Sequence, residues 1–416
     1  MNTRQTTFLA ARTLAGLCVT VLLAYSAVAE EGIPAEVGEP LPAWEEGWLE
    51  VHHINTGRGD AAFFILPDGT TMLFDAGDLA DGARPEGYIP PRRPDGSRPA
   101  GEWIGRYIRA RHPGGEDAAL DYAIMSHFHG DHTDGFADVA ELLFVETLLD
   151  REGSVERASD EYGTFVDDYI ERGMTMEKFE AGRDDQLVLR HDPGAFPDFK
   201  IRNLAVNAEA WTGTGHETRP RFAEGESIPS RENTFSTAFV MRYGPFAYFA
   251  GGDLQEPVEK AIAWVTGPVD VHVANHHGSQ AHPFFLAALR PRVHIVEVWA
   301  VIQPRPHVFE RLFDESIYPG PRDVFLTNGL WEGRAEHFLE RHDERVADLI
   351  DGYTVEMGRE YVEYYMPKTA SSQGHVVVRV EPGGDRYHVA VLDDTAESFE
   401  VLSVHGPYTS RSAVPE

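Results

Sequence analysis

The residues best suited to chemistry in this chain are gathered in a six-residue run, residues 127–132 (HFHGDH). Four of them, His127, His129, Asp131 and His132, carry side chains that bind metals, and their spacing suits a tight loop folded around a cation. Imidazole and carboxylate ligands together favour zinc, manganese or iron over calcium or magnesium. The segment predicts a metal site, and a histidine-rich surface turn is the other interpretation.

The pattern HxHxDH is the signature of the metallo-β-lactamase superfamily, and the resemblance extends beyond it. Residues 53–60 (HINTGRGD) and 74–77 (FDAG) look like the opening of that fold in the ComEC-type branch, named for the hydrolase domain of DNA-uptake proteins. Residues 251–254 (GGDL) and 276–279 (HHGS) follow in the expected order and spacing. The resemblance covers roughly residues 48–330. It implies an α/β chain folded as a four-layer αβ/βα sandwich, with the site at an edge where loops of both sheets meet.

Carried over residue by residue, the resemblance implies two divalent metal ions, with zinc preferred and manganese or iron as the other choices. His127 and His129 should bind the first metal, and Asp131 and His132 the second. Asp253 should bridge the two ions.

The last metal ligand is expected from the pair His276-His277. Adjacent residues at the end of a strand point to opposite sides, so only one of them should contact metal directly. We assign His277 as that ligand and His276 as a hydrogen-bond donor to the substrate or leaving group. Asp75 is expected to orient a ligand imidazole through its other ring nitrogen, although an ordinary turn aspartate is an equal interpretation. His307 resembles a late histidine of ComEC-like domains and is a weaker candidate beside the ligands.

The chain departs from many superfamily members at the first metal. These members place a third histidine between the HxHxDH loop and the bridging aspartate, and here only His191 and His216 lie in that interval. Neither stands before a strand at the expected place, where residues 232–236 read ENTFS. The first metal is therefore expected to be held by two histidines and Asp253. Water or the side-chain oxygen of Asn233 would be its remaining ligand.

The expected reaction is metal-assisted hydrolysis, in which two cations lower the pKa of a shared water to about 7. Asp131 would orient the hydroxide, and His276 would assist the leaving group. A phosphodiester is the first choice of substrate, because two metals stabilise both the attacking and the leaving oxygen. A lactone, thioester or β-lactam is the alternative, and a metal-binding module without turnover is the alternative outside enzymes.

Charge limits the choice of substrate. The 416 residues contain 68 acidic and 36 basic residues, which gives a formal net charge of −32. Long nucleic acids are repelled by such a field, so a small or short anionic substrate is expected. One basic stretch, with Arg84, Arg92, Arg93 and Arg98, follows the Asp75 strand. It could bind an anion through bidentate contacts, or it could be a solvated loop or an interface.

Residues 1–29 predict a cleaved secretory signal peptide. Arg4 and Arg12 give a positive start, residues 14–24 are apolar, and a small-x-small cleavage site ends the segment. A membrane anchor is the other interpretation, but the apolar stretch is short of the ~20 residues that a span needs. Cleavage would remove Cys18, the only cysteine, and leave a protein in the periplasm or outside the cell, without disulfides or stable membrane insertion.

The elements that must position these side chains alternate between strands and helices. Apolar and alternating runs predict strands, and the spacing of Ile104, Tyr107 and Ile108 predicts a helix over 102–111. The expected strands cover residues 49–54, 61–66, 71–74, 120–125, 237–243, 247–250, 269–274, 376–380 and 387–392. Residues 150–182 are expected to be mostly helical, and residues 212–231 to form a loop. The predicted organisation is a signal peptide (1–29), a hydrolase domain (30–350) and a small C-terminal β-rich extension (351–416).

Overall fold

The structure is a computed structural model that describes residues 35–83, 88–115, 118–152, 161–300, 303–329 and 361–411. Residues 35–416 belong to one unit. The predicted signal peptide, Arg84 and the predicted boundary between residues 350 and 351 lie outside the described residues.

The first of two sheets has nine strands and is mixed. It runs antiparallel from β17 to β3 and parallel from β3 to β6. Its strands, in spatial order, are β17 (Val401–Thr409), β16 (Arg386–Leu392), β15 (His375–Val380), β1 (Leu49–His53), β2 (Ala62–Ile65), β3 (Thr71–Phe74), β4 (Ala119–Met125), β5 (Phe144–Asp150) and β6 (Thr175–Lys178).

The second sheet has eight strands and is also mixed, with parallel pairing from β14 to β11 and antiparallel pairing from β11 to β9. Its strands, in spatial order, are β14 (Asp323–Leu326), β13 (Val293–Val296), β12 (Val271–Val273), β11 (Phe246–Ala250), β10 (Ala238–Tyr243), β7 (Phe199–Val206), β8 (Glu209–Trp211) and β9 (Thr218–Pro220).

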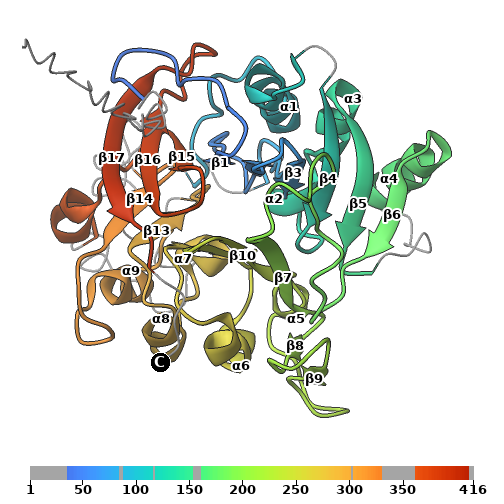
Figure 1. The fold of residues 1–416 in the computed structure, drawn as a ribbon, viewed down its shortest axis with the longest axis vertical. Helices are drawn as coiled ribbons and strands as arrows, with labels where there is room; N and C mark the ends of the chain where they lie inside the picture. The colour runs from blue at the N-terminus through green and yellow to red at the C-terminus, as the bar shows by residue number, and fades with distance from the viewer. Residues whose placement is uncertain are drawn as a thin grey trace, which may run out of the picture. The chain divides into compact units, whose positions relative to one another are not determined.

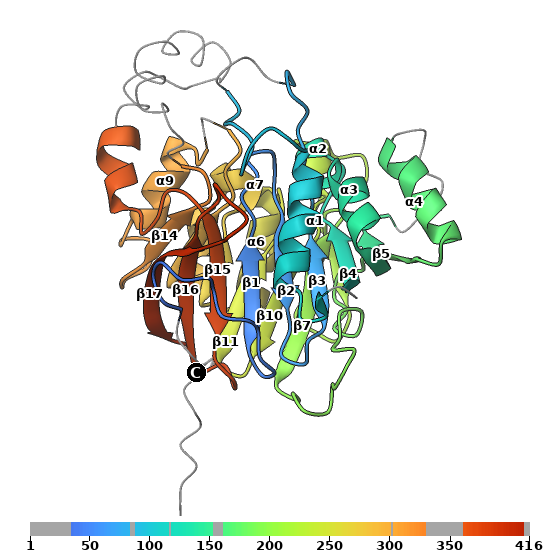
Figure 2. The same cartoon turned by 90° about the horizontal axis from the view of Figure 1, so that it is seen from above.

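Helices cover the outer face of each sheet, so that the unit has four layers (Figure 1, Figure 2). The helices on the first sheet are α1 (Ala100–Arg111), α3 (Phe136–Leu142) and α4 (Glu161–Glu171). Those on the second sheet are α6 (Glu256–Thr266), α8 (Pro283–Leu289) and α9 (Pro306–Phe313). Short segments are α2 (Gly130–Thr133), α5 (Arg231–Thr234), α7 (Asn275–Gly278), η2 (Tyr361–Tyr365) and η3 (Met366–Lys368).

The main hydrophobic core lies between the two sheets. Phe64 of β2 packs edge to face against Phe239 and Tyr248 of the second sheet, with ring centroids 6.1 and 5.6 Å apart. All five residues of β11 (FAYFA) are buried, as is typical of a strand covered on both faces, and β1 (LEVHH) is also buried throughout although it carries Glu50, His52 and His53. This architecture confirms the predicted αβ/βα sandwich.

The C-terminal strands are present, and they extend the first sheet itself. β15 pairs with the whole length of β1, from Leu49 opposite Val380 to His53 opposite Val376. The third of these strands, β17, was not predicted. Because β15 and β16 carry alternate buried valines into the core between the sheets, they contribute to the same hydrophobic centre as β1.

Two predicted segments differ in detail from the structure. Within residues 150–182, the described helix is confined to α4, and β6 adds a parallel edge strand at Thr175–Lys178. The predicted loop over 212–231 contains the short strand β9. Short edge strands such as β9, whose residues are all exposed, lack the buried alternation that a sequence pattern detects. No helix among the described residues has the length and apolar character needed to cross a bilayer.

Candidate metal centre

The candidate centre lies where parallel strands of both sheets end. Asp75 follows β3 and residues 126–132 follow β4 in the first sheet. Asp253 follows β11, and His276 and His277 follow β12 in the second. Since the carboxyl ends of parallel strands open at one edge, two pairs of strands deliver these side chains to the same place. The fold thereby brings together the expected ligands, which lie far apart in the sequence.

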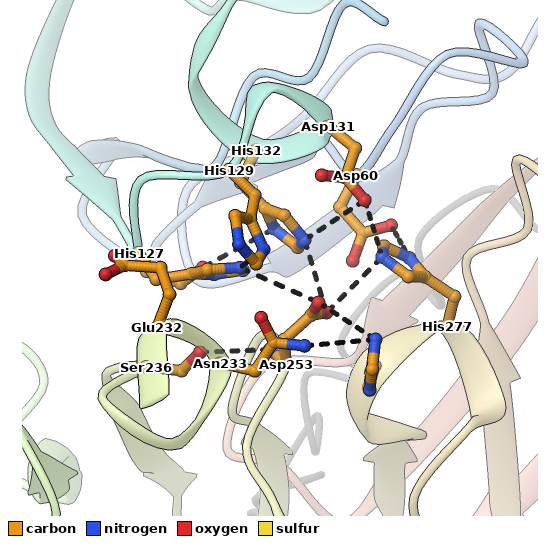
Figure 3. A network of polar contacts seen from close by, with 12 residues as sticks. Asp60, His127, His129, Asp131, His132, Glu232, Asn233, Ser236, Asp253 and His277 are labelled. Carbon is orange, nitrogen blue, oxygen red and sulfur yellow. Dashed lines mark hydrogen bonds and ion pairs between the residues drawn. The ribbon is translucent and has the colours of Figure 1, made fainter. Parts of the chain in front are cut away.

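Asp253 stands at the middle of the centre (Figure 3). Its Oδ1 lies 3.2 Å from Nε2 of His132 and 3.3 Å from Nε2 of His277. Its Oδ2 lies 3.6 Å from Nε2 of His127. The two oxygens of one carboxylate therefore face two separate groups of imidazoles, the arrangement that a bridging ligand requires.

The second-metal group consists of Asp131, His132, Asp253 and His277, all buried. Oδ2 of Asp131 lies 3.1 Å from Nε2 of His277 and 3.8 Å from Nε2 of His132. Within the described residues, His132 Nε2, His277 Nε2 and Asp253 Oδ1 are buried and have no hydrogen-bond partner. Buried polar atoms normally find partners, so three such atoms facing one point fit a cation held between them.

The first-metal group is more open. Nε2 of His127 lies 3.0 Å from Nδ1 of His129, whose side chain is exposed, and both are close to Asp253. Burial, together with the neighbouring His132, lowers the pKa of His127 well below its ordinary value. A neutral imidazole is the form that binds a metal, so His127 is in a ligand's protonation state.

No further histidine from the interval between residues 132 and 253 reaches the described first-metal group. His191 lies exposed, 3.4 Å from Asp121, and His216 lies 3.1 Å from Asp184. Asn233 does reach the centre, where its Nδ2 lies 3.1 Å from Nε2 of His276 and its buried Oδ1 has no hydrogen-bond partner in the described chain. The departure noted in the sequence is therefore visible in the structure.

Hydrogen bonds behind the imidazoles orient their rings. Oδ2 of Asp75 lies 2.8 Å from Nδ1 of His132, the contact expected for Asp75. Its Oδ1 accepts the backbone N–H of Ser126 at 2.6 Å. The hydroxyl of Ser126 lies 3.1 Å from Nδ1 of His127. Both rings thus have Nδ1 occupied from behind and direct Nε2 into the centre.

Asp60 has the same relation to His277, and the sequence analysis did not assign it a role. Its Oδ1 lies 2.8 Å from Nδ1 of His277, while its backbone N–H donates to the carbonyl of Asp131 at 2.9 Å. The backbone at Gly59 and at Gly77 lies very close to that of Asp131. A Cβ added to Gly59 or Gly77 would lie 2.2 or 2.0 Å from the carbonyl oxygen of Asp131. The motif GRGD is the signal that could have identified Asp60, because glycine is required where backbones meet this closely.

The structure corrects the geometry assumed for His276 and His277, that adjacent residues at the end of a strand point to opposite sides. Both residues adopt left-handed backbone conformations, with φ of 54° and 52°. The strand alternation therefore does not apply to them. Nε2 of His276 lies 3.5 Å from Oδ2 of Asp253, and Nε2 of His277 lies 3.3 Å from Oδ1. Left-handed non-glycine residues cost on the order of 1–3 kcal/mol each, and such strain is concentrated at functional sites.

The centre combines buried carboxylates with imidazoles. Burial alone would raise the pKa of Asp253, but the neighbouring imidazoles, led by His276 and His277, hold it well below its usual range. Burial would lower the pKa of His277, but the carboxylates of Asp60 and Asp253 raise it well above its ordinary value. The carboxylates thus attract positive charge to this point, and divalent cations would compete with protons for it.

The arginine loop is largely engaged within the protein. Arg92 forms ion pairs with Asp78 at 3.3 Å and with Asp81 at 2.9 Å. Arg98 pairs with Glu102 in the first turn of α1. These two guanidinium groups therefore stabilise the loop before α1. His307 lies exposed at the start of α9 and forms none of the contacts around Asp253 described above.

No protein-family model and no curated protein matches the sequence. The chain is similar to several solved structures. One is a metallo hydrolase, Igni18, from the archaeon Ignicoccus hospitalis (12% identity, 60% of this chain and 81% of that chain, TM-score 0.32). Others are the short form of human tRNase Z (12%, 59% and 91%, 0.31) and a mutant metallo-β-lactamase from Cronobacter sakazakii (13%, 78% and 93%, 0.29). What the centre can do chemically follows from its own side chains.

Proposed function

We propose that this protein is a hydrolase that uses two divalent metal ions, zinc in the first place. The observation that carries the proposal is the carboxylate of Asp253, which faces one set of imidazoles with each oxygen. His127 and His129 would hold one ion, and Asp131, His132 and His277 the other. Three buried atoms of the second group that lack a hydrogen bond, described above, support the same assignment.

When bound, two such ions would lower the pKa of a water to about 7 and neutralise charge on the reacting oxygens. The chain's own groups supply the rest. The carboxylate of Asp131 can accept a hydrogen bond from the attacking water and orient it. His276 lies beside the same carboxylate of Asp253, and its side chain is only partly buried. It is therefore placed to donate a hydrogen bond to the substrate.

A small phosphodiester is the substrate that we favour. A site with two cations can stabilise both the attacking and the leaving oxygen of a phosphoryl group. A net charge of −32 opposes long polyanions, whereas a small diester meets only the local field of the centre. A neutral lactone, thioester or β-lactam is the second candidate, and the ion pairs of Arg92 and Arg98 favour it because they leave these arginines less available to an anion.

The test uses the purified protein with its metal content measured. We expect two zinc or manganese ions per chain and cleavage of bis(p-nitrophenyl) phosphate faster than of duplex DNA. Rapid opening of lactones with every phosphodiester left intact would decide for the second candidate. A chain that holds no metal and gains no activity with added zinc or manganese would contradict the proposal as a whole.

We also propose that the enzyme is exported, on the basis of the signal pattern in residues 1–29. The native protein should then begin at Glu30 and be found in the periplasm or medium. N-terminal sequencing that finds Met1, or fractionation with the inner membrane, would contradict export.

A further inference from the structure

The adjacent histidines His276 and His277 differ in what lies behind their rings. Nδ1 of His277 faces a carboxylate oxygen of Asp60 at 2.8 Å. Nδ1 of His276 faces the side-chain nitrogen of Gln255 at 3.2 Å. A carboxylate only accepts hydrogen bonds and an amide nitrogen only donates them. The two rings are therefore placed to carry their protons on opposite nitrogens.

The orientation of the Gln255 amide follows from a second contact. The same nitrogen donates to the backbone carbonyl of Asp253 at 2.8 Å. A carbonyl oxygen cannot donate, so the amide cannot be turned to place its oxygen there. Gln255 is buried, which protects both hydrogen bonds from solvent. Nδ1 of His276 must then accept, and its proton must lie on Nε2.

Asn233 completes this assignment. Its Nδ2 lies 3.1 Å from Nε2 of His276, and its Oδ1 has no hydrogen-bond partner among the described residues, so this amide, unlike that of Gln255, can be turned without loss of a hydrogen bond to Oδ1. If Nε2 carries the proton, the amide of Asn233 must present its oxygen to it, because two donors cannot pair. That orientation engages the Asn233 carbonyl with His276, and the oxygen is then no longer a ligand for the first metal. Of the two choices left open by the sequence, water rather than Asn233 would complete that shell.

We propose that Gln255 holds His276 as the Nε2–H tautomer, so that His276 donates from Nε2 to Asn233 in the free protein and to a bound substrate in its place, while His277 presents a lone pair to the metal. His277 is held in the opposite tautomer by Asp60. Two neighbouring residues of one type thereby take two roles, and the left-handed backbone at both positions directs both rings to Asp253. The tautomer itself is independent of the reaction, whereas the contact with substrate rests on the proposed function.

The direct test is the tautomer, read from ¹⁵N NMR of the histidine-labelled, zinc-loaded protein. His276→Gln identifies the signals of His276 by their loss. We expect a protonated, pyrrole-like Nε2 and an unprotonated Nδ1 in the wild type. Gln255→Glu places an acceptor at Nδ1 and should move the proton there. A protonated Nδ1 in the wild type would overturn the proposal, whatever the activity of the enzyme.

Metal content and kinetics give the second readout. Gln255→Glu should keep two zinc ions and lose roughly a hundredfold in kcat, the scale of a positioned proton donor, with little change in KM. Gln186→Glu is the matched control, because the side-chain nitrogen of Gln186 also donates to a backbone carbonyl, that of Lys178. Both residues lie far from Gln255 in the sequence. This variant should behave as wild type.

Two further outcomes separate this inference from the proposed function. Asn233→Leu should keep both zinc ions, and loss of one ion from a folded variant would show that Asn233 is a ligand and overturn the assignment. If the wild type binds zinc and hydrolyses no substrate, the proposed function fails, but the NMR result still decides the tautomer. Equal kcat for wild type and Gln255→Glu in an active enzyme would overturn the role of the His276 N–H.

Discussion

Two sets of buried histidines in this molecule differ in their surroundings. In the second sheet, His272 and His294 face each other through Nδ1 atoms 3.1 Å apart, and Nε2 of His294 meets the hydroxyl of Tyr318 at 2.8 Å. In the first sheet, His375 accepts the backbone N–H of Asn55 at 3.0 Å. These partners are neutral. At the metal centre, by contrast, imidazoles face carboxylates.

This difference has an electrostatic consequence. Burial lowers the pKa of His272 and of His375 to about 3, so both are neutral parts of the core. The equally buried His132 has its pKa raised well above the ordinary value, because the nearby carboxylates of Asp253 and Asp75 outweigh the effect of burial. Buried histidine alone therefore does not indicate a metal site, and neither does one carboxylate beside it, because His53 lies buried 3.3 Å from Glu297. The convergence of several imidazoles on the one carboxylate of Asp253 distinguishes the candidate centre.

The largest effect should come from removing the shared carboxylate. Asp253→Ala should lose both metal ions and lower hydrolysis by roughly a thousandfold or more, since the main electrostatic support of the reaction goes with them. Elemental analysis and initial rates measure this. Asp184→Ala is the control, because Asp184 also lies beside a histidine, His216, but pairs with Lys200 and Arg202. It should change neither metal content nor rate.

Asp60→Asn should have the next largest effect. Asn would no longer hold Nδ1 of His277 with a charged acceptor, and loss of such support typically lowers metal affinity 10- to 100-fold. Competition with a chelator measures the affinity of the second ion. His191→Ala, which alters an exposed histidine paired with Asp121, should leave it unchanged. An unaltered affinity in Asp60→Asn would break the distinction between the two histidine environments.

Replacing a core histidine should instead change how the free energy of unfolding depends on pH. The folded protein resists protonation of His375, whose pKa is about 3, while the unfolded chain takes up that proton near 6.5. The unfolded state therefore gains protons first, and stability falls as the pH decreases below 6.5. His375 should account for about 2 kcal/mol of the loss between pH 7 and 5. Urea unfolding of wild type and His375→Gln at both values measures this, and an equal loss in both would contradict it.

The smallest effect is expected from Arg92→Ala. Arg92 pairs with Asp81, which is mostly exposed, and such ion pairs contribute about 0–1 kcal/mol to stability. Because the guanidinium is held by Asp78 and Asp81, KM should change less than about twofold for a phosphodiester and for a lactone alike. Steady-state kinetics on both substrates test this. A selective rise in KM for the phosphodiester would restore Arg92 as an anion-binding residue.

These comparisons also show which parts of the centre a sequence can predict. His127, His129, Asp131 and His132 lie within six residues, so their proximity follows from local spacing. The fold and the distant ligands Asp253 and His277 could be predicted because the motifs that carry the family resemblance occur in the expected order and spacing. The contacts behind the ligands could not.

Asp60 meets His277 across 217 positions, and only the packed sheets bring them together. The backbone geometry assumed for His276 and His277 was wrong for another reason. The left-handed conformation of His276, repeated at His277, is rare for residues with a Cβ, so an extended strand end was the natural expectation. The hydrogen bond from Gln255 to the ring of His276 depends on that turn, so the sequence could not predict it either.

The pairing of β1 with β15 has a consequence for how the protein is made. Leu49–His53 leaves the ribosome long before its partner His375–Val380. Until then one edge of β1 has no partner, and an open strand edge is prone to pair with other chains. Such a distant contact also slows folding, because a long loop must close before the pairing is gained. Completion of the first sheet, and of the core beneath it, must therefore wait until β15 and the strands after it have been synthesised.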